Sequence, residues 1–265
     1  MPTENRESES HRAKTGHKRV VVMGKDSEHF AQMVREAGFE IVPHSGNPDL
    51  VIAYGGDGSL LGADREYPEI PKVAIRRDSE FEKCAHHQNE DVLRRVAEGK
   101  QSVSLLPRVE AFVNGRHIQG INDIVFHNAY APSAVRYRVR IDGEEYNEEI
   151  VGDGLVVSTP FGSTAYYRSI TNSVFRVGLG LAFNNSTQSI NHLVLDSSST
   201  IEVLVTRGPG LLFSDNLPTP VRVDREDTIR IQASSSRAEI WELGTLTCLH
   251  CFSRQTNLPA GFRHV

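Results

Sequence analysis

Apolar residues in the first hundred positions occur as short β-branched runs separated by stretches with helical spacing. That spacing is clearest at Phe30, Met33, Val34 and Ala37, and Gly38 follows as a stop signal. Strands and helices that alternate in this way predict an α/β fold with a parallel sheet. The predicted strands are residues 19–23, 39–43, 49–54 and 72–75, and the predicted helices begin near residues 27, 60 and 90.

After about residue 102 the pattern changes to short runs of alternating apolar and polar residues, which predict β-strands. Two of the breaks between runs, Asn114-Gly115 and Asp142-Gly143, are typical of hairpin turns. The second half is therefore predicted to be mostly β. Its predicted strands are residues 109–113, 118–126, 135–141, 155–158, 193–195, 201–205, 221–223, 228–231 and 238–243.

This change of pattern divides the chain. We expect an α/β N-terminal domain followed by a mostly-β C-terminal domain, with the boundary near residue 103. The expected divisions are a disordered tail at residues 1–17, an α/β domain at 18–103, a β-rich domain at 104–247 and a segment at 248–265 that could return to the N-terminal domain.

Composition narrows the range of partners. The 265 residues carry a formal net charge of −5, which gives no electrostatic reason to expect nucleic acid or an anionic membrane. No apolar run approaches the length that spans a bilayer, and the polar N-terminus lacks the apolar stretch of a signal peptide. Cys84, Cys248 and Cys251 are expected to be reduced thiols, which favours a cytoplasmic location.

The first candidate site follows the apolar run at residues 49–54. A Gly-Gly-Asp-Gly loop that leads into a helix lets the backbone approach a phosphate, which then faces N–H groups at the helix N-terminus. Asp57 in that loop could take a proton from an attacking hydroxyl or help to hold a metal, and Ser59 could cap the helix. The residues expected to hold the anion are Gly55, Gly56, Gly58 and Ser59.

This loop alone leaves alternatives open. A plain left-handed turn with an aspartate cap fits the same four residues, and lipid kinases and phosphofructokinases carry similar loops. The sequence is not a Walker motif, because no Gly-Lys-Ser/Thr follows, and it is not the dinucleotide pattern Gly-x-Gly-x-x-Gly.

The second candidate site lies at residues 152–166, which read Gly-Asp-Gly-Leu-Val-Val-Ser-Thr-Pro-Phe-Gly-Ser-Thr-Ala-Tyr. A predicted strand runs into Thr159-Pro160 and then into a glycine turn that enters a helix. Hydroxyl and N–H groups at such a helix start suit polar recognition of a nucleotide, and Tyr166 offers a flat face for stacking.

This second segment closely resembles the signature of the NAD kinase family. The Gly-Gly-Asp-Gly-Ser-Leu-Leu loop resembles the family's other hallmark, with Ser59 where threonine is usual. Further matches of the same order and spacing are Asn122-Asp123, which resembles the family's Asn-Glu/Asp pair, and residues 213–224, which resemble its later Asp-Gly segment.

The resemblance implies a two-domain fold with the site between the domains. It also implies transfer of a phosphoryl group from ATP, or polyphosphate, to the adenosine 2′-hydroxyl of NAD, giving NADP, with Mg²⁺ or another divalent metal and no assigned protein ligands for it. A homodimer or homotetramer is implied as well. By the same resemblance Asp57 is the base, Asn122 and Thr164 contact adenine, and Asp123 binds ribose hydroxyls. The rest of the implied set is Ser163, with Asp153, Ala165 and Tyr166 at the nicotinamide end, partly across a subunit interface.

The sequence departs from the family pattern in three places. Arg76 and Arg77 stand where the family has glycines. Guanidinium groups bind phosphate bidentately, so Arg76 is included in the expected site for the phosphate donor. A solvated basic pair fits these two residues equally well. Residues 167–173 lack the family's Gly-Gly-Pro, and Phe161 replaces a small residue. Two alternatives are therefore kept: a kinase of the same superfamily that acts on another hydroxyl, and a non-catalytic nucleotide-binding sensor on a kinase scaffold.

Overall fold

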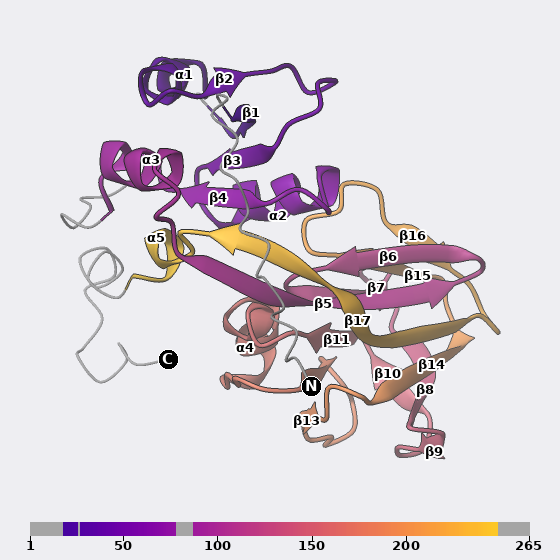
Figure 1. The fold of residues 1–265 in the computed structure, drawn as a ribbon. Coiled ribbons are helices and arrows are strands. Elements are labelled where there is room, and N and C mark those ends of the chain that lie inside the picture. Colours follow the sequence, from indigo (N-terminus) through magenta and orange to yellow (C-terminus); the bar gives the residue numbers. More distant parts are fainter. Residues whose placement is uncertain (1–17, 26, 78–86, 249–265) are drawn as a thin grey trace, which may run out of the picture.

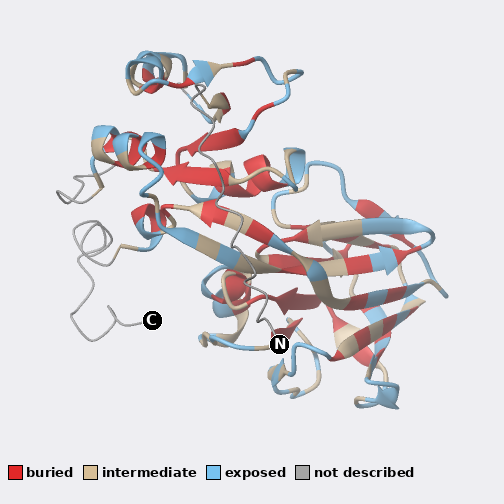
Figure 2. Cartoon of the chain, viewed as in Figure 1, coloured by how far each residue is buried: buried red, intermediate tan, exposed pale blue. Residues whose placement is uncertain are grey.

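The N-terminal part of the chain is a parallel sheet with helices packed on it (Figure 1), in a computed structural model that describes residues 18–25, 27–77 and 87–248. Its elements are β1 (Arg19–Met23), α1 (Ser27–Glu36), β2 (Glu40–Ile41), β3 (Leu50–Tyr54), α2 (Asp57–Glu66), β4 (Lys72–Ile75) and α3 (Asn89–Ala97). Every residue of β3 and β4 is buried, which Figure 2 shows as continuous red. Helices on both faces of a parallel sheet account for that burial.

The C-terminal part consists almost entirely of strands. They are β5 (Val103–Val113), β6 (Arg116–Gly120), β7 (Asp123–Asn128), β8 (Val135–Ile141), β9 (Glu144–Glu145), β10 (Ile150–Gly152), β11 (Gly154–Ser158), β12 (Leu179–Asn184), β13 (Leu193–Leu195), β14 (Thr200–Arg207), β15 (Gly210–Ser214), β16 (Val221–Val223) and β17 (Thr228–Trp241). The helical segments are η3 (Gly162–Thr164), α4 (Tyr166–Thr171) and α5 (Gly244–Thr247). The predicted fold class, α/β followed by mostly β, is confirmed.

Two sheets organise the strands that the structure describes. A six-stranded antiparallel sheet has the order β13-β12-β11-β7-β15-β16. The other sheet has 11 strands and includes the N-terminal parallel strands together with β5, β8, β14 and β17. Apolar side chains from both sheets, among them Phe126, Leu155 and Val203, form one core between them. The C-terminal part is therefore a sandwich of two sheets.

Strand β17 joins the two parts of the molecule. Its last residues, Ile240 and Trp241, pair in parallel with Lys72 and Val73 of β4, while its earlier residues pair with β14 and β5. The boundary expected near residue 103 falls at the first residue of β5, and the large sheet runs across it. The expected tail at residues 1–17 and the returning segment from 249 onward lie outside the described residues, although Leu246 of α5 packs in a core cluster with Val51 and Leu60.

Several predicted elements differ from the observed ones for physical reasons. The hairpin turns are confirmed: Asn114 and Asp142 have positive φ, followed by the glycines that favour it. The predicted strands 228–231 and 238–243 are one strand, β17, because a register shift between Ala233 and Arg237 interrupts the alternation without ending the pairing. Strands β12 and β15 were not predicted; β12 is buried almost throughout and therefore lacks the polar alternation.

A buried charge cluster lies between the two parts. The carboxylate of Asp64 in α2 accepts hydrogen bonds from Lys72 Nζ at 2.6 Å and from Arg108 Nη2 at 2.7 Å and Nε at 3.1 Å. Lys72 is 0% exposed and Arg108 is 1% exposed. Because α2, β4 and β5 each contribute one member, this cluster fixes the N-terminal part against the start of the C-terminal part.

Candidate active site

The Gly-Gly-Asp-Gly loop connects the end of β3 to the start of α2. Gly55 has a φ of +149°, and a Cβ placed on it would lie 2.3 Å from Ser59 Oγ, so glycine is required there. No side chain caps α2, which begins after Gly56, and Asp57 and Gly58 are exposed. The N–H groups of the first turn therefore face solvent as a potential anion site, next to the Asp57 carboxylate.

Ser59 does not have the capping role expected from the sequence. Helix α2 begins at Asp57, three residues before the predicted start at Leu60, so Ser59 lies inside the first turn. Its hydroxyl faces the space beside Gly55. The apolar spacing pointed to Leu60 because that is the first buried residue of the helix, and the preceding turn is polar and exposed to solvent.

Asn122 and Asp123 lie where β6 passes into β7, and the second candidate segment is tied to them. Thr159 donates through its N–H to the Asn122 carbonyl at 2.8 Å and through Oγ1 to the Ile121 carbonyl at 2.6 Å. A Cβ on Gly162 would lie 2.1 Å from the Asn122 carbonyl oxygen. The glycine turn therefore packs directly on the Asn122 backbone, which brings the second candidate segment into contact with the Asn122-Asp123 pair.

Asp123 sits in an environment that disfavours its charge. Burial and then the nearby charge of Asp215 raise the pKa of Asp123 to about 7. Burial also raises the pKa of Asp215 to about 6, against three backbone hydrogen bonds that lower it. Two carboxylates with raised pKa values at the junction of two parts of a fold are typical of a functional site.

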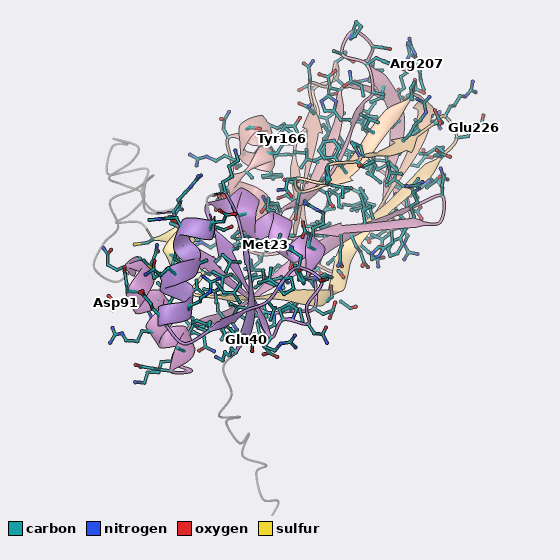
Figure 3. All side chains as sticks on the ribbon, turned by 90° about the horizontal axis from the view of Figure 1, so that it is seen from above. Met23, Glu40, Asp91, Tyr166, Arg207 and Glu226 are labelled. Atoms are coloured by element: carbon teal, nitrogen blue, oxygen red, sulfur yellow. The ribbon has the colours of Figure 1, made fainter. Side chains whose placement is uncertain are left out.

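Tyr166 and Asp153 belong to the same neighbourhood. Burial, followed by the charges of Asp153 and Asp123, raises the pKa of Tyr166. Asn184 Nδ2 donates to the Tyr166 hydroxyl at 2.9 Å, and Asn185 Nδ2 donates to Asp153 Oδ2 at 3.0 Å. Seen from above, Tyr166 lies near the junction of the two parts, whereas Arg207 and Glu226 lie at the far end of the C-terminal part (Figure 3).

The predicted residues of the glycine turn divide into two kinds. Ser163 is 1% exposed, and its hydroxyl lies within hydrogen-bonding distance of the carbonyls of Pro160 at 2.7 Å and Phe175 at 3.1 Å, so it holds the turn together. Thr164 and Ala165 are exposed and accessible to a ligand. The turn itself is a 3₁₀ segment that precedes α4.

Arg76 lies at the same sheet edge as the loop, since the Ile75 carbonyl accepts the Gly55 N–H at 2.7 Å. Its guanidinium bonds the C-terminal helix α5: Nε donates to the Thr245 carbonyl at 2.9 Å, and Nη2 donates to the Leu246 carbonyl. A phosphate would compete with these carbonyls for two of its donors. The neighbouring residues 78–86, which include Phe81 and Cys84, lie outside the described part of the chain.

The structure adds two residues that sequence reasoning left without a role, Asp215 and Asn216. Asn216 Nδ2 donates to the Gly58 carbonyl at 3.0 Å, and Asp215 accepts the backbone N–H groups of residues 121–123. The loop and the Asn122-Asp123 pair are therefore connected through this turn. The signal available in the sequence was an Asp-Asn pair one residue after the apolar run at residues 211–213.

A cleft of about 800 Å³ opens beside the glycine turn, which forms part of its wall. Its walls include Phe161 and Thr164, the start of β5, the segment before β12 and the irregular middle of β17. The volume is typical of a small-molecule site. Arg176 and Arg237 line this cleft.

The described side chains offer no metal centre of their own. Within residues 18–25, 27–77 and 87–248, His, Cys, Asp and Glu side chains form no group of three or more that could hold a metal ion. Mg²⁺ in proteins commonly takes part of its coordination from substrate phosphates and water. No helix in the same residues is long and apolar enough to cross a membrane.

Together the loop, the paired carboxylates and the two-part fold form a site whose chemistry suits a phosphorylated ligand. Residues 121–243 match the family model for the ATP-NAD kinase C-terminal domain. The chain is 32% identical over 170 residues to an NAD kinase of Hahella chejuensis and 34% identical over 173 residues to one of Marinobacter nauticus, covering 59% of this chain in each case. Over residues 121–243 the chain is thus similar to the C-terminal domain of the NAD kinase family.

Solved structures agree with this fold. The crystal structure of yeast NADH kinase complexed with NADH matches with a TM-score of 0.77 and 16% identity, covering 95% of this chain and 91% of that one. An NAD kinase from Archaeoglobus fulgidus in complex with ATP matches with a TM-score of 0.69 and 20% identity, covering 91% and 99%. The sequence matches span only 57% and 58% of the lengths of the two curated relatives.

Proposed function

We propose that this protein is an NAD kinase, which transfers the terminal phosphoryl group of ATP to the 2′-hydroxyl of the adenosine ribose of NAD. One observation carries the proposal: the turn at Asp215-Asn216 ties Gly58 to Asn122-Asp123. That link brings an exposed carboxylate and an uncapped helix N-terminus next to the expected nucleotide-binding pair. The match of residues 121–243 to the ATP-NAD kinase C-terminal domain supports NAD as the acceptor, and the structural relatives described with NADH and with ATP support a dinucleotide and a nucleotide as ligands.

Asp57 is the proposed base. Its carboxylate accepts the proton of the 2′-hydroxyl while the oxygen bonds to the γ-phosphorus, and the bond from that phosphorus to the β–γ bridging oxygen breaks to release ADP. The N–H groups at the start of α2 hold phosphate oxygens. A divalent cation such as Mg²⁺, when bound with the nucleotide, would supply positive charge to neutralise the phosphates.

The acceptor is proposed to lie along the C-terminal side of the junction. Asn122 and Thr164 contact adenine, and Asp123 binds ribose hydroxyls. The exposure of Thr164 supports this assignment, and Ser163 serves the turn rather than the ligand, because its hydroxyl is buried against two carbonyls. The nicotinamide end is assigned to Asp153, Ala165 and Tyr166.

We further propose that the enzyme works as a homo-oligomer in the cytoplasm. Three apolar side chains support an interface between copies: Leu105 is 61% exposed, Val177 is 76% exposed and Val194 is 49% exposed.

The test is direct product formation. Purified protein is incubated with Mg²⁺ and NAD, with either ATP or polyphosphate as donor, and NADP is separated and quantified by liquid chromatography; NADH replaces NAD in a parallel series. NADP formation that depends on a donor supports the proposal, and the two series identify the preferred donor and acceptor.

Other outcomes favour the alternatives. NAD binding without any NADP would point to a sensor, which Phe161 favours because this bulky side chain packs against the core cluster that includes Leu60 and Leu61 of α2. Hydrolysis of ATP that is stimulated by a different hydroxyl compound would point to another acceptor.

A further inference from the structure

The turn after β15 has an unusual conformation and an unusual set of contacts. Asp215 adopts a φ of +47°, which a non-glycine residue seldom takes. The turn is closed by a hydrogen bond from the Leu217 N–H to the Ser214 carbonyl at 2.9 Å, and the Asp215 N–H donates to the Asp123 carbonyl at 3.1 Å. The left-handed conformation therefore directs the Asp215 side chain and backbone toward the start of β7.

The Asp215 carboxylate accepts three consecutive backbone N–H groups. Oδ2 accepts from Ile121 at 2.9 Å, and Oδ1 accepts from Asn122 at 2.8 Å and from Asp123 at 3.2 Å. A Cβ on Gly120 would lie 2.5 Å from Oδ1, so the chain leaves room for this carboxylate. Hydrogen bonds to a charged acceptor are about twice as strong as neutral ones, so this cage fixes the peptide that bears Asn122 and Asp123.

The next residue reaches the other side of the junction. Asn216 Nδ2 donates to the Gly58 carbonyl in the first turn of α2, at 3.0 Å. Arg65, near the other end of α2, donates through Nη1 to Asn216 Oδ1 at 2.5 Å and to the Asn216 carbonyl at 3.2 Å. Asn216 thus contacts both ends of the helix that begins with Asp57.

We propose that Asp215 is a positioning residue that fixes Asn122 and Asp123 in place, and that Asn216 sets their distance from the loop that carries Asp57. Neither side chain needs to touch a ligand for this role. All three hydrogen bonds that the Asp215 carboxylate accepts come from backbone N–H groups. Asn216 is bonded to the Gly58 carbonyl and to the Arg65 side chain, both of which belong to α2. The proposal rests on the proposed function only for the identity of the ligand, NAD.

The substitutions separate the two contacts. Asp215→Asn keeps the size of the side chain and turns one acceptor oxygen into a donor that opposes a backbone N–H. Asn216→Ala removes the link to Gly58 and leaves the cage around residues 121–123 intact. Asp142→Asn is the matched control, because Asp142 also has positive φ, at +53°, and accepts the backbone N–H of Thr200 at 2.8 Å in the hairpin after β8.

Two readouts are taken on the full-length protein: amide hydrogen exchange over residues 121–123 and the dissociation constant for NAD in the absence of a donor. In Asp215→Asn we expect both the exchange rate and the dissociation constant to rise about tenfold, corresponding to the loss of one charge-assisted hydrogen bond. In Asp142→Asn both should stay within about twofold of wild type, even though a similar turn is weakened. Asn216→Ala should leave NAD affinity nearly unchanged and lower kcat, because only the approach of the loop is altered.

Unchanged exchange at residues 121–123 in Asp215→Asn would overturn the proposal, and so would an equal rise in the dissociation constant in the Asp142 variant. The exchange measurement needs neither NAD nor turnover. A wild-type protein that makes no NADP would therefore contradict the proposed function and still leave the positioning role testable.

Discussion

Asp64→Asn tests how strongly the buried charge cluster holds the two parts of the molecule together. The substitution removes the carboxylate that pairs with both Lys72 and Arg108, whose side chains are 0% and 1% exposed. Burial already lowers the pKa of Lys72, and the charge of Asp64 offsets that effect. Two buried cations would then lie together without a counter-charge in the cluster, so the loss of folding free energy should be about 3–5 kcal/mol.

The assay is urea unfolding at pH 7.5, followed by the fluorescence of Trp241, which is the only tryptophan in the sequence and lies in β17. With a typical slope for a protein of this size, a loss of that magnitude lowers the urea midpoint by about 1–2 M. Because Lys72 can lose its proton at high pH, the deficit should be smaller at pH 9.5 than at pH 6.

The matched control is Asp91→Asn, which breaks an exposed ion pair with Arg94 in α3. Exposed pairs contribute less than about 1 kcal/mol, so this variant should unfold close to wild type. If Asp64→Asn and Asp91→Asn have the same midpoint, the cluster does not hold the two parts together and the reasoning from burial is wrong.

Two further predictions concern the site. Gly162→Ala should weaken NAD binding and lower the thermal midpoint, because its Cβ would meet the Asn122 carbonyl oxygen at 2.1 Å. The control is Gly62→Ala in α2, which should be tolerated because the nearest atom to its Cβ is 3.9 Å away. Equal effects of the two variants in calorimetry and in NAD binding would refute this prediction. Burial and then the charge of Asp215 raise the pKa of Asp123 to about 7, so wild type should lose folding stability as pH rises from about 4 to 7. Asp123→Asn lacks that loss, so its stability relative to wild type should grow over the same window and level off above it in urea unfolding; a difference that does not change with pH would contradict the burial of this carboxylate.

The local parts of the fold could be predicted because neighbouring residues determine them. The turn at Asn114-Gly115 has φ values of +50° and +72°, which few other residue pairs adopt, so two residues suffice to predict a hairpin. The loop at residues 55–58 was predictable for a similar reason: an apolar strand must end, and Gly55 permits the conformation that follows.

The long-range parts depend on partners that no local pattern specifies. Pairing of Ile240 and Trp241 with β4 joins residues about 170 positions apart, and an alternating run gives no information about which strand it will meet. Asp215 is similar, since its three donors lie 92–94 residues earlier in the chain. In the sequence this residue is an ordinary turn aspartate, and only the fold brings it to Asp123.

Two predicted site residues have partners within the fold that their sequence context did not reveal. Ser163 belongs to the segment that identified the family, yet its hydroxyl is used to close the turn against Phe175. Arg76 has the right chemistry for phosphate, but α5, from the other end of the chain, occupies two of its donors. Residue type predicts what a side chain can bind, and the surrounding fold determines which partner is within reach.

The central claim, that Asp57 takes the proton from the ribose hydroxyl, is tested most directly by comparing NADP formation and NAD binding in wild type and Asp57→Asn. The exposed position of Asp57 makes a folding defect in this variant unexpected. We expect the rate of NADP formation to fall by about 10²–10⁴-fold while the dissociation constant for NAD stays within about twofold. A variant that forms NADP at the wild-type rate would contradict the claim.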